Sequence, residues 1–507
     1  MSAGSSLAVA RRAGMLAKVA ASAARLALTR DDAARRSLAA ALVEARGIPL
    51  KVGQFLADGS EAYEAAVSQV PPLPLAEVRH LFEPLDEHLA HLEPAIAAAS
   101  LGQVHPARLK DGREVVIKVQ YPHIGEAVDA ELSLLSAVPV MGKARSAGMD
   151  VDAYRKTLGA ALKEELDYNK EAAAQSSARR LGVPGFYVPE VISELCTSTL
   201  LVQERVHGVS TRVAAGWRAD ERASLARSLV GGWAKMALVR GEVHADAHLG
   251  NLLCRRTPQG PELVVLDWGS VSKVSVARRL AVLRILRMAR LGTQDDPFSI
   301  LCAFGFDPIR LAPLKGTLPA ITRAIGEVLT SKAHSASLDL GGRLAAILGD
   351  ARWWFRAAGP SDLFLLVRML RALGARLTDL DVQLDLGKWI AEVTPEVLVD
   401  QAGQAAHAAH AALAAQAALS ASATVIAPAT WLKVEVLRAG VQTARVAMPA
   451  ERAFVLEDLL PEAALAGAKR RGMDIGRVAA DLRRLGLSPR VLFELTEGDT
   501  RWRAWLE

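Results

Sequence analysis

Three short motifs in a fixed order constrain this chain more than any other feature of its sequence. The first is Lys118, late in the apolar run VVIKV. The second is the stretch HADAHLGN, in which Asp246 and Asn251 have the spacing D-x₄-N. The third is D-W-G, which begins at Asp267 directly after the apolar run LVVL. Phosphoryl transfer needs a lysine on the phosphates, an aspartate at the acceptor, and Asn and Asp oxygens for Mg²⁺. The set therefore predicts a site of that kind.

Each motif is weak by itself. A lysine on a strand, such as Lys118, more often reaches water along its aliphatic stem, and a D-x-G triplet is usually only a turn. The combination is far more specific, because strand lysine, H-x-D-x₄-N and D-x-G follow one another in this order in protein kinases. We therefore interpret the three motifs together as a site for ATP and Mg²⁺.

The segments around the motifs predict a bilobal, protein-kinase-like α+β fold. VHPARL, the turn KDG and REVVIKVQ indicate a hairpin, since Asp-Gly favours tight turns between strands. NLLCRR and ELVVLDWG indicate a second hairpin, and TLLVQERVHG a strand. Between them, Leu158, Leu162 and Leu166 recur at helical spacing. Helices are expected in the first ninety residues and after about Ser275.

We divide the chain into four predicted regions. They are an N-terminal helical extension over 1–90, a kinase-like N-lobe over 91–205, a kinase-like C-lobe over 206–400, and a helical C-terminal extension over 401–507. A length of 507 residues is enough for two domains or for one large core with appended helices.

Charge and composition limit the kinds of binding partner and the compartment expected for this chain. The net charge of +6 comes without a Lys/Arg run long enough to follow a nucleic acid backbone, so no nucleic acid partner is expected. The 3 cysteines are far apart and favour a reducing compartment. The uncharged stretch 402–431 is rich in Ala, Gln and His, and we interpret it as a packed helix rather than a membrane span. We predict a cytoplasmic protein that can contact a membrane surface peripherally.

One part of an ordinary kinase site is missing. No G-x-G-x-x-G loop precedes Lys118, and its place is taken by Ala97, Ala98, Ala99 and Ser100. Alanine does not adopt positive φ cheaply, so this loop should hold nucleotide differently from a glycine-rich one. The alternative is the start of an alanine-rich helix.

At this point the chain resembles the UbiB/AarF-type atypical kinase family, of the protein-kinase-like superfamily. The family's K-x-G-Q signature stands at Lys51 to Gln54, and its alanine-rich loop is the stretch AIAAASLGQVHPARLKDGREVVIKVQYP. Its E-x-D element is Glu165 to Asp167, followed by H-A-D…G-N and D-x-G. The resemblance runs from Lys51 to about Asp379.

The resemblance implies a role for each matching residue. Lys118 would contact the nucleotide phosphates and pair with Glu171, whereas ordinary kinase spacing would suggest Glu131. Asp246 would be the catalytic-loop aspartate. Asn251 and Asp267 would be the magnesium ligands.

The family signature implies further site residues. Lys51 and Gln54 would lie on a helical extension that covers the protein-substrate entrance, near Glu165 and Asp167. This would disfavour protein phosphorylation and favour ATP hydrolysis or small-molecule chemistry. Without the resemblance, Lys51 would be read as a helix-surface lysine. The strand TLLVQE adds its last residues to the predicted nucleotide-binding set, namely Gln203 and Glu204.

The chain departs from the family pattern at three positions. Ala247 and Leu249 replace the prolines of H-A-D-P-H-P-G-N, and Trp268 replaces the Phe of D-F-G. The loss of two prolines should loosen the loop. The polar set is intact, which favours an active site over a pseudokinase.

Three functions stay open from the sequence. The first is an ATP-dependent kinase or ATPase that supports isoprenoid-quinone or membrane-lipid metabolism, with a lipid or quinone precursor as a further ligand. The second is a phosphotransferase acting on soluble small molecules, against which the K-x-G-Q element argues. The third is a nucleotide-binding scaffold without turnover.

Overall fold

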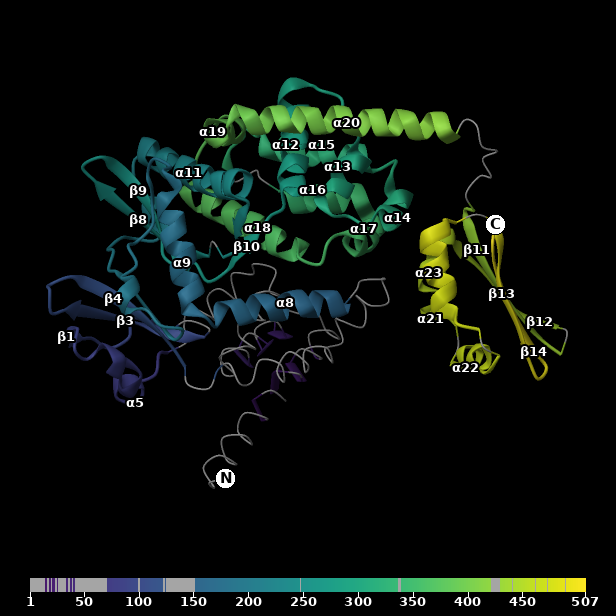
Figure 1. Cartoon of the computed structure of the whole chain (residues 1–507), viewed down its shortest axis with the longest axis horizontal. Coiled ribbons are helices and arrows are strands. Elements are labelled where there is room, and N and C mark those ends of the chain that lie inside the picture. Colours follow the sequence, from purple (N-terminus) through teal and green to yellow (C-terminus); the bar gives the residue numbers. More distant parts are fainter. Residues whose placement is uncertain are drawn as a thin grey trace.

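A computed structural model of the chain describes residues 71–98, 101–121, 124, 151–246, 248–335, 339–420, 429–439, 441–460, 462–471, 473–487 and 489–507, with scattered positions between 14 and 41. Figure 1 shows two lobes and a separate C-terminal unit. Of the N-terminal extension predicted over 1–90, the structure describes 71–90 and the scattered positions, whereas Lys51 and Gln54 lie outside the described residues.

The N-lobe is built on one antiparallel sheet with the order β1-β3-β4-β6, and β2 pairs with β3. Its strands are β1 (Leu89–Leu92), β2 (Ala97–Ala98), β3 (Gly102–Leu109), β4 (Glu114–Gln120) and β6 (Leu200–Glu204). The predicted hairpin is confirmed as β3 and β4, which turn at Gly112 with a φ of 91°. Alternation along β4 buries Ile117 and Val119 in an apolar cluster with α5 (Leu75–Val78). Lys118 therefore points to the opposite face of the sheet.

Two helices connect β4 to β6. The predicted helical stretch is confirmed as α8 (Val151–Glu165) and α9 (Tyr168–Ala178). The helices separate at Asp167, whose extended backbone and side chain cap α9 by accepting a hydrogen bond from the N–H of Asn169. In Figure 1, α8 extends from the N-lobe beneath the helices of the C-lobe.

The C-lobe surrounds the second predicted hairpin, which is confirmed as β8 (Leu252–Thr257) and β9 (Gly260–Val265). β5 (Phe186–Tyr187) pairs in parallel with β9, and β7 (Glu242–His244) pairs with β10 (Val271–Lys273). The helices of this lobe are α10 (Thr211–Ala214), α11 (Ala219–Ala234), α12 (Val276–Leu291), α13 (Pro297–Phe304), α14 (Pro308–Leu311), α15 (Leu318–Leu329), α16 (Leu340–Leu348), α17 (Arg352–Ala358), α18 (Leu363–Leu380) and α19 (Leu386–Val393).

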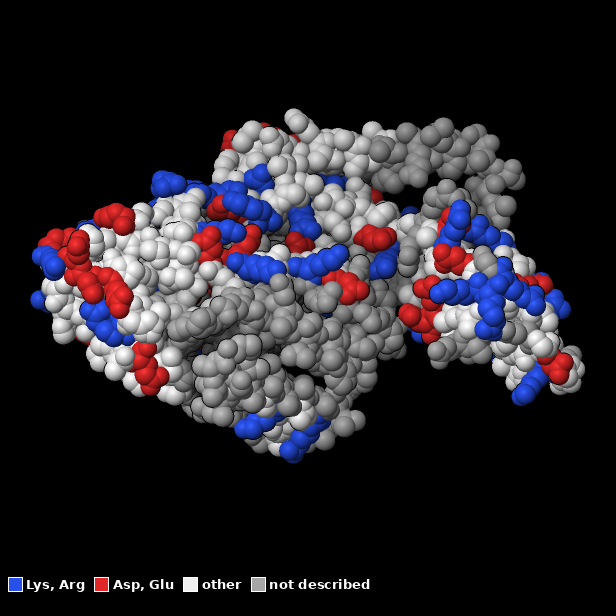
Figure 2. Space-filling model, turned by 60° about the horizontal axis from the view of Figure 1, so that its bottom comes forward, with Lys and Arg blue, Asp and Glu red and all other residues white. Residues whose placement is uncertain are grey.

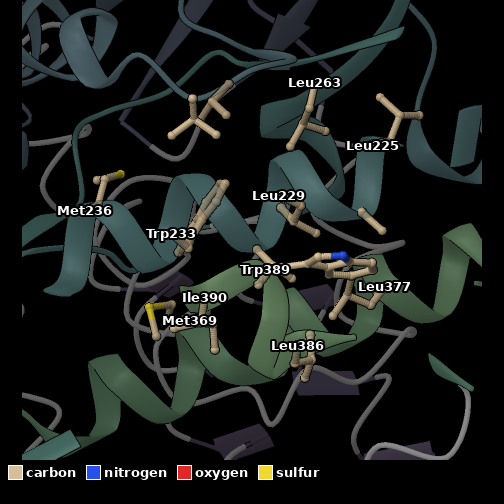
Figure 3. Close-up of a cluster of buried hydrophobic side chains, with 14 of the residues drawn as sticks. Leu225, Leu229, Trp233, Met236, Leu263, Met369, Leu377, Leu386, Trp389 and Ile390 are labelled. Atoms are coloured by element: carbon tan, nitrogen blue, oxygen red, sulfur yellow. The ribbon is translucent and has the colours of Figure 1, made fainter. Parts of the chain in front are cut away.

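The main apolar core lies between α11, α18 and α19, directly behind the site motifs. Figure 3 shows Trp233 and Leu229 from α11 facing Met369 and Trp389. The Nε1–H of Trp233 donates to the carbonyl of His244 at 3.0 Å, which ties the core to the H-x-D segment. A large core of this kind lets the C-lobe hold polar loops in fixed positions.

The C-terminal region differs from its prediction. Helix α20 (Glu396–Ser420) lies along α12, as expected for a packed helix. Beyond it the prediction of a helical extension is wrong, because four strands form a sheet in the order β12-β11-β14-β13. They are β11 (Trp431–Arg438), β12 (Val441–Pro449), β13 (Arg490–Glu497) and β14 (Thr500–Leu506), with α21 (Leu456–Leu459), α22 (Glu462–Arg470) and α23 (Ile475–Leu485) between the two hairpins.

We call residues 429–507 the C-terminal unit, because they have an apolar core of their own. Figure 1 shows the three helices on one side of the sheet. Partly buried Ile309 and Trp354 of the C-lobe pack against this core. Within the described part of the chain, none of the helices combines the length and the apolar character needed to cross a membrane.

Candidate active site

Lys118 lies at the centre of a buried charge cluster. Its Nζ is 2.9 Å from both carboxylate oxygens of Glu171 and 2.9 Å from Oδ2 of Asp267. The three residues come from β4, from α9 and from the segment after β9, so the fold brings together positions up to 149 apart in sequence. The predicted ion pair of Lys118 with Glu171 is present, while Glu131 lies outside the described residues.

Burial and mutual attraction act in opposite directions on this cluster. Burial alone would lower the pKa of the Lys118 ammonium, but the carboxylates of Asp267 and Glu171 raise that pKa well above its ordinary value. Burial and the nearby Asp267 carboxylate raise the pKa of Glu171 to about 7, against the opposing effect of Lys118. One cation thus serves two carboxyl groups, and the cluster has room for further positive charge.

A tyrosine that no motif singles out supports Lys118 from below. Tyr168 is the first residue of α9, and its ring lies 5.1 Å from Nζ of Lys118, within the range of a cation–π contact. Burial raises the pKa of the Tyr168 hydroxyl. The sequence signal that could have identified Tyr168 is its position directly after Asp167, because the capped start of α9 fixes the direction of the Tyr168 ring.

The H-x-D segment is held by a histidine in one tautomer. The backbone N–H of Asp246 donates to Nδ1 of His244 at 3.2 Å. Nδ1 therefore carries no proton, and Nε2–H donates to the carbonyl of Asp267 at 2.5 Å. Burial lowers the pKa of His244, which keeps the ring neutral. One histidine thus connects the loop of Asp246 to the D-W-G segment.

Asn251 and Asp246 form the other half of the site. The Nδ2 group of Asn251 donates to the carbonyl of Asp246 at 3.0 Å, and both residues are buried. The loop is therefore well bonded although Leu249 stands where the family has proline; Ala247 is outside the described residues. The loosening expected from the loss of the two prolines stays a prediction.

Arg368 is a site residue that the sequence reasoning missed. Its Nη2 lies 2.6 Å from Oδ1 of Asp246, and the exposed fractions of the two side chains are 15% and 4%. Arg368 lies on α18, more than a hundred residues after Asp246, at no spacing that a motif records. Only the packing of α18 against α11 and β7 brings it to the site.

The D-W-G segment packs as expected. Trp268 is buried, with its ring edge-on to His244 at 4.9 Å and its Nε1–H donating to the carbonyl of Val265. Its own backbone N–H donates to Glu171 at 3.3 Å, while Gly269 N–H donates to Oδ1 of Asp267. The bulkier aromatic residue is thus held in the core, while the Asp267 carboxylate is bonded to Gly269 N–H and to Lys118.

The alanine-rich segment begins as a strand and not as a helix. Ala97 and Ala98 pair with β3, while Ala99 and Ser100 lie outside the described residues. The next described glycine, Gly102, approaches β4 so closely that a Cβ there would lie 2.1 Å from the carbonyl oxygen of Val119. Because Ala97 and Ala98 belong to a strand, the alternative of a helix start at this position is excluded.

Other predicted residues have local roles in the described structure. Asp167 caps α9, and Glu165 is buried at the end of α8. The Gln203 side chain bonds to Gln175 and to the carbonyl of Leu266. Both carboxylate oxygens of Glu204 accept from the Tyr187 hydroxyl, at 2.9 and 2.7 Å. The side chains of Gln203 and Glu204 are thus engaged within the fold, and their nucleotide-binding roles stay predictions.

The residues present fit a magnesium ion. Within the described residues no group of three or more His, Cys, Asp or Glu side chains forms a metal site. Mg²⁺ in nucleotide sites needs only one or two protein oxygen ligands, because phosphates and water supply the others. Since Nδ2 of Asn251 donates to the carbonyl of Asp246, Oδ1 is the atom of this side chain that would bind a metal, and Asp267 would supply a carboxylate oxygen.

Comparison with known proteins gives a family match and several relatives. Residues 66–295 match the family described as ABC1 atypical kinase-like domain. The mitochondrial atypical kinase coq-8 of Caenorhabditis elegans is 31% identical over 252 residues, which are 46% of this chain and 33% of that protein. The probable protein kinase UbiB of Aeromonas hydrophila is 33% identical over 226 residues, which are 42% of this chain and 39% of that protein.

A longer match covers more of both chains. The probable protein kinase UbiB of Vibrio cholerae is 29% identical over 330 residues, covering 56% of this chain and 60% of that protein. The chain thus spans about a third to three fifths of the length of these relatives. The family match includes Lys118, Glu171, Asp246, Asn251 and Asp267, and it ends before α18.

Proposed function

We propose that this chain, which carries an ABC1 atypical kinase-like domain, binds ATP with Mg²⁺ and transfers or hydrolyses the γ-phosphate. The chain is related to the UbiB-type atypical kinases, as its motifs predicted. The observation that carries the proposal is the convergence of Lys118, Glu171 and Asp267 on one ammonium, beside the loop of Asp246 and Asn251.

The residues divide the work of the reaction. Lys118, held by Glu171, would neutralise the α- and β-phosphates. Asp246 would orient the hydroxyl or water that accepts the phosphoryl group and take its proton. The neutral His244 keeps the loops of Asp246 and Asp267 in register through its two ring nitrogens. The bonded network supports catalysis by positioning, because the contact between Lys118 and Asp267 is the part of it that has to open.

Asn251 and Asp267 would hold the magnesium ion. When bound, Mg²⁺ supplies positive charge to the phosphate oxygens during transfer. The cluster around Lys118 favours such an ion, since two carboxyl groups share one lysine there. Release of Asp267 from Lys118 is what this chain must contribute for the ion to bind.

The cellular role follows from the relatives and is part of the proposal. Proteins named UbiB and coq-8 point to isoprenoid-quinone metabolism, so a quinone precursor or lipid is the proposed further ligand. Figure 2 shows groups of basic side chains both on the C-terminal unit at the right and on the lobes, with acidic side chains nearby. The basic groups support peripheral contact with an anionic membrane surface.

Nucleotide turnover by the purified chain tests the proposal. ATP hydrolysis is measured with Mg²⁺, with EDTA, and with or without liposomes of anionic phospholipid. Asp267→Asn should lower turnover at least about 100-fold, because it removes a charged metal ligand. The matched control is Asp220→Asn, on the exposed start of α11. Equal turnover in wild type and Asp267→Asn would refute the proposal.

A further inference from the structure

The placement of Arg368 depends on a helix that is fixed on two sides. Leu365 and Met369 of α18 are buried in the C-lobe. Phe364, one turn before Arg368, packs against the cluster of Leu101, Leu158 and Leu162, which belongs to the N-lobe and α8. Residues at positions i and i+4 share one face of a helix. The face of α18 that closes on α8 therefore also delivers the guanidinium to Asp246.

The partner of Arg368 is held just as firmly. The backbone N–H of Asp246 donates to His244 and its carbonyl accepts from Asn251. Its carboxylate Oδ1 lies 2.6 Å from Arg368 and 4.0 Å from Nε2 of His248. The ion pair with Arg368 is largely removed from water. Buried ion pairs contribute little net stability compared with apolar pairs of similar volume. Stability alone thus gives no reason for a guanidinium at this place.

We propose that Arg368 is a second catalytic cation of the site, which contacts the phosphoryl group as it passes to the acceptor held by Asp246. This inference rests on the proposed function, because it adds a residue to the same reaction. A guanidinium carries five N–H donors in a planar fork, so it can bond a carboxylate and a phosphate together. The site has two cations, Lys118 on Glu171 and Asp267, and Arg368 on Asp246. The proposed function assigns Lys118 to the α- and β-phosphates, which leaves the γ-phosphate for Arg368.

The step balances as an ordinary phosphoryl transfer. A bond forms between the acceptor oxygen and the γ-phosphorus, and the bond from the γ-phosphorus to the β–γ bridging oxygen breaks. The bridging oxygen keeps the electron pair and leaves with ADP, and the acceptor proton passes to Asp246. Arg368 stabilises the charge on the transferred oxygens from the acceptor side, as arginine does in other phosphoryl-transfer sites.

The test compares Arg368→Gln and Arg368→Lys with Arg290→Gln, an exposed arginine near the end of α12. For each purified variant, kcat and KM for ATP are measured, along with stabilisation by MgATP in thermal unfolding. Arg368→Gln should lower kcat about 10²–10³-fold, with KM and ATP stabilisation within about threefold of wild type. Arg368→Lys should lose at least about tenfold, because an ammonium cannot bridge both groups.

A further measurement separates a catalytic role from a structural one. Added guanidine at millimolar concentration should restore part of the turnover of Arg368→Ala and leave Arg290→Gln unchanged. If Arg368→Gln does not fold, the kcat of Arg368→Lys decides the matter. A wild-type kcat in these variants, or a rise in turnover showing that Arg368 blocks the acceptor position, would overturn the inference while the proposed function stands. Absence of MgATP turnover in the wild type would overturn both.

Discussion

The two lobes and the C-terminal unit differ in the kind of side chain that they bury. In the lobes, buried side chains include Glu171, Asp246, Asn251 and His244, all of them in contact with the site. Among the described residues of 429–507, no buried side chain is polar or charged. There, ions such as Arg501 and Glu494 pair on the surface. The lobes thus bury charged side chains, at the site and also in structural pairs such as Arg284 with Asp295, while the C-terminal unit is held by apolar packing.

The largest expected effect comes from leaving buried Glu171 and partly buried Asp267 without their cation. Lys118→Met should lower the free energy of unfolding by about 3–5 kcal/mol, because Glu171 and Asp267 then face each other in a buried site. Urea unfolding and MgATP stabilisation measure it. Lys110→Met, in the exposed β3–β4 turn, is the control. Equal stability of the two variants would show that the cluster is hydrated and would erase the contrast.

The next effect lies in the C-terminal unit. Leu432→Ala should cost about 2–5 kcal/mol, since Leu432 is 0% exposed and lies between β12 and β14. Val441→Ala, 67% exposed, should change stability by less than about 0.5 kcal/mol. Stabilisation of the lobes by MgATP should be the same in both variants. A loss of MgATP stabilisation in Leu432→Ala would mean that the two regions are not separate in energy.

A smaller effect concerns pH. The pKa of Glu171 is raised to about 7 in the folded chain from an ordinary 4.5. The folded state therefore binds more protons than the unfolded state between these values. Its stability without nucleotide should fall as pH rises from about 5 to about 7, by up to about 1.4 kcal/mol per pH unit. Glu171→Gln should flatten this slope, and exposed Glu194→Gln should not. A slope that persists in Glu171→Gln would assign it to another group.

The smallest effect tests the support of the site. Asp167→Ala should cost about 1 kcal/mol, because it removes the cap of α9, the helix that carries Glu171. Asp167→Asn keeps a capping oxygen and should stay within a few tenths of wild type. Thermal unfolding compares the two. Equal losses in both variants would favour the role as a charged site residue that the family resemblance implies for Asp167.

The sequence predicted the strands around the site better than the strands of the C-terminal unit. The family resemblance implied the pairing of Lys118 with Glu171, whereas ordinary kinase spacing suggested Glu131. Both hairpins around the site were predicted, because turn residues are local signals. Arg368 left no such signal, since its approach to Asp246 depends on how α18 packs. The strands of the C-terminal unit were missed although TRWRAWL alternates with period two, because the surrounding Ala, Leu and Arg favour helices. The pairing of β11 with β14 also joins segments about seventy residues apart, which no local signal predicts.

The close approach of Gly102 to β4 has a consequence for the variation this chain can tolerate. Any side chain at position 102 would meet the Val119 carbonyl and the Tyr168 hydroxyl, so even the smallest replacement must force β3 away from β4 and displace the Tyr168 ring. Gly112 also stands in a special place, with a φ of 91°, but it has open space around it and can be exchanged for asparagine at small cost. Among natural variants of this chain, we expect other residues at position 112 of the turn and glycine alone at position 102.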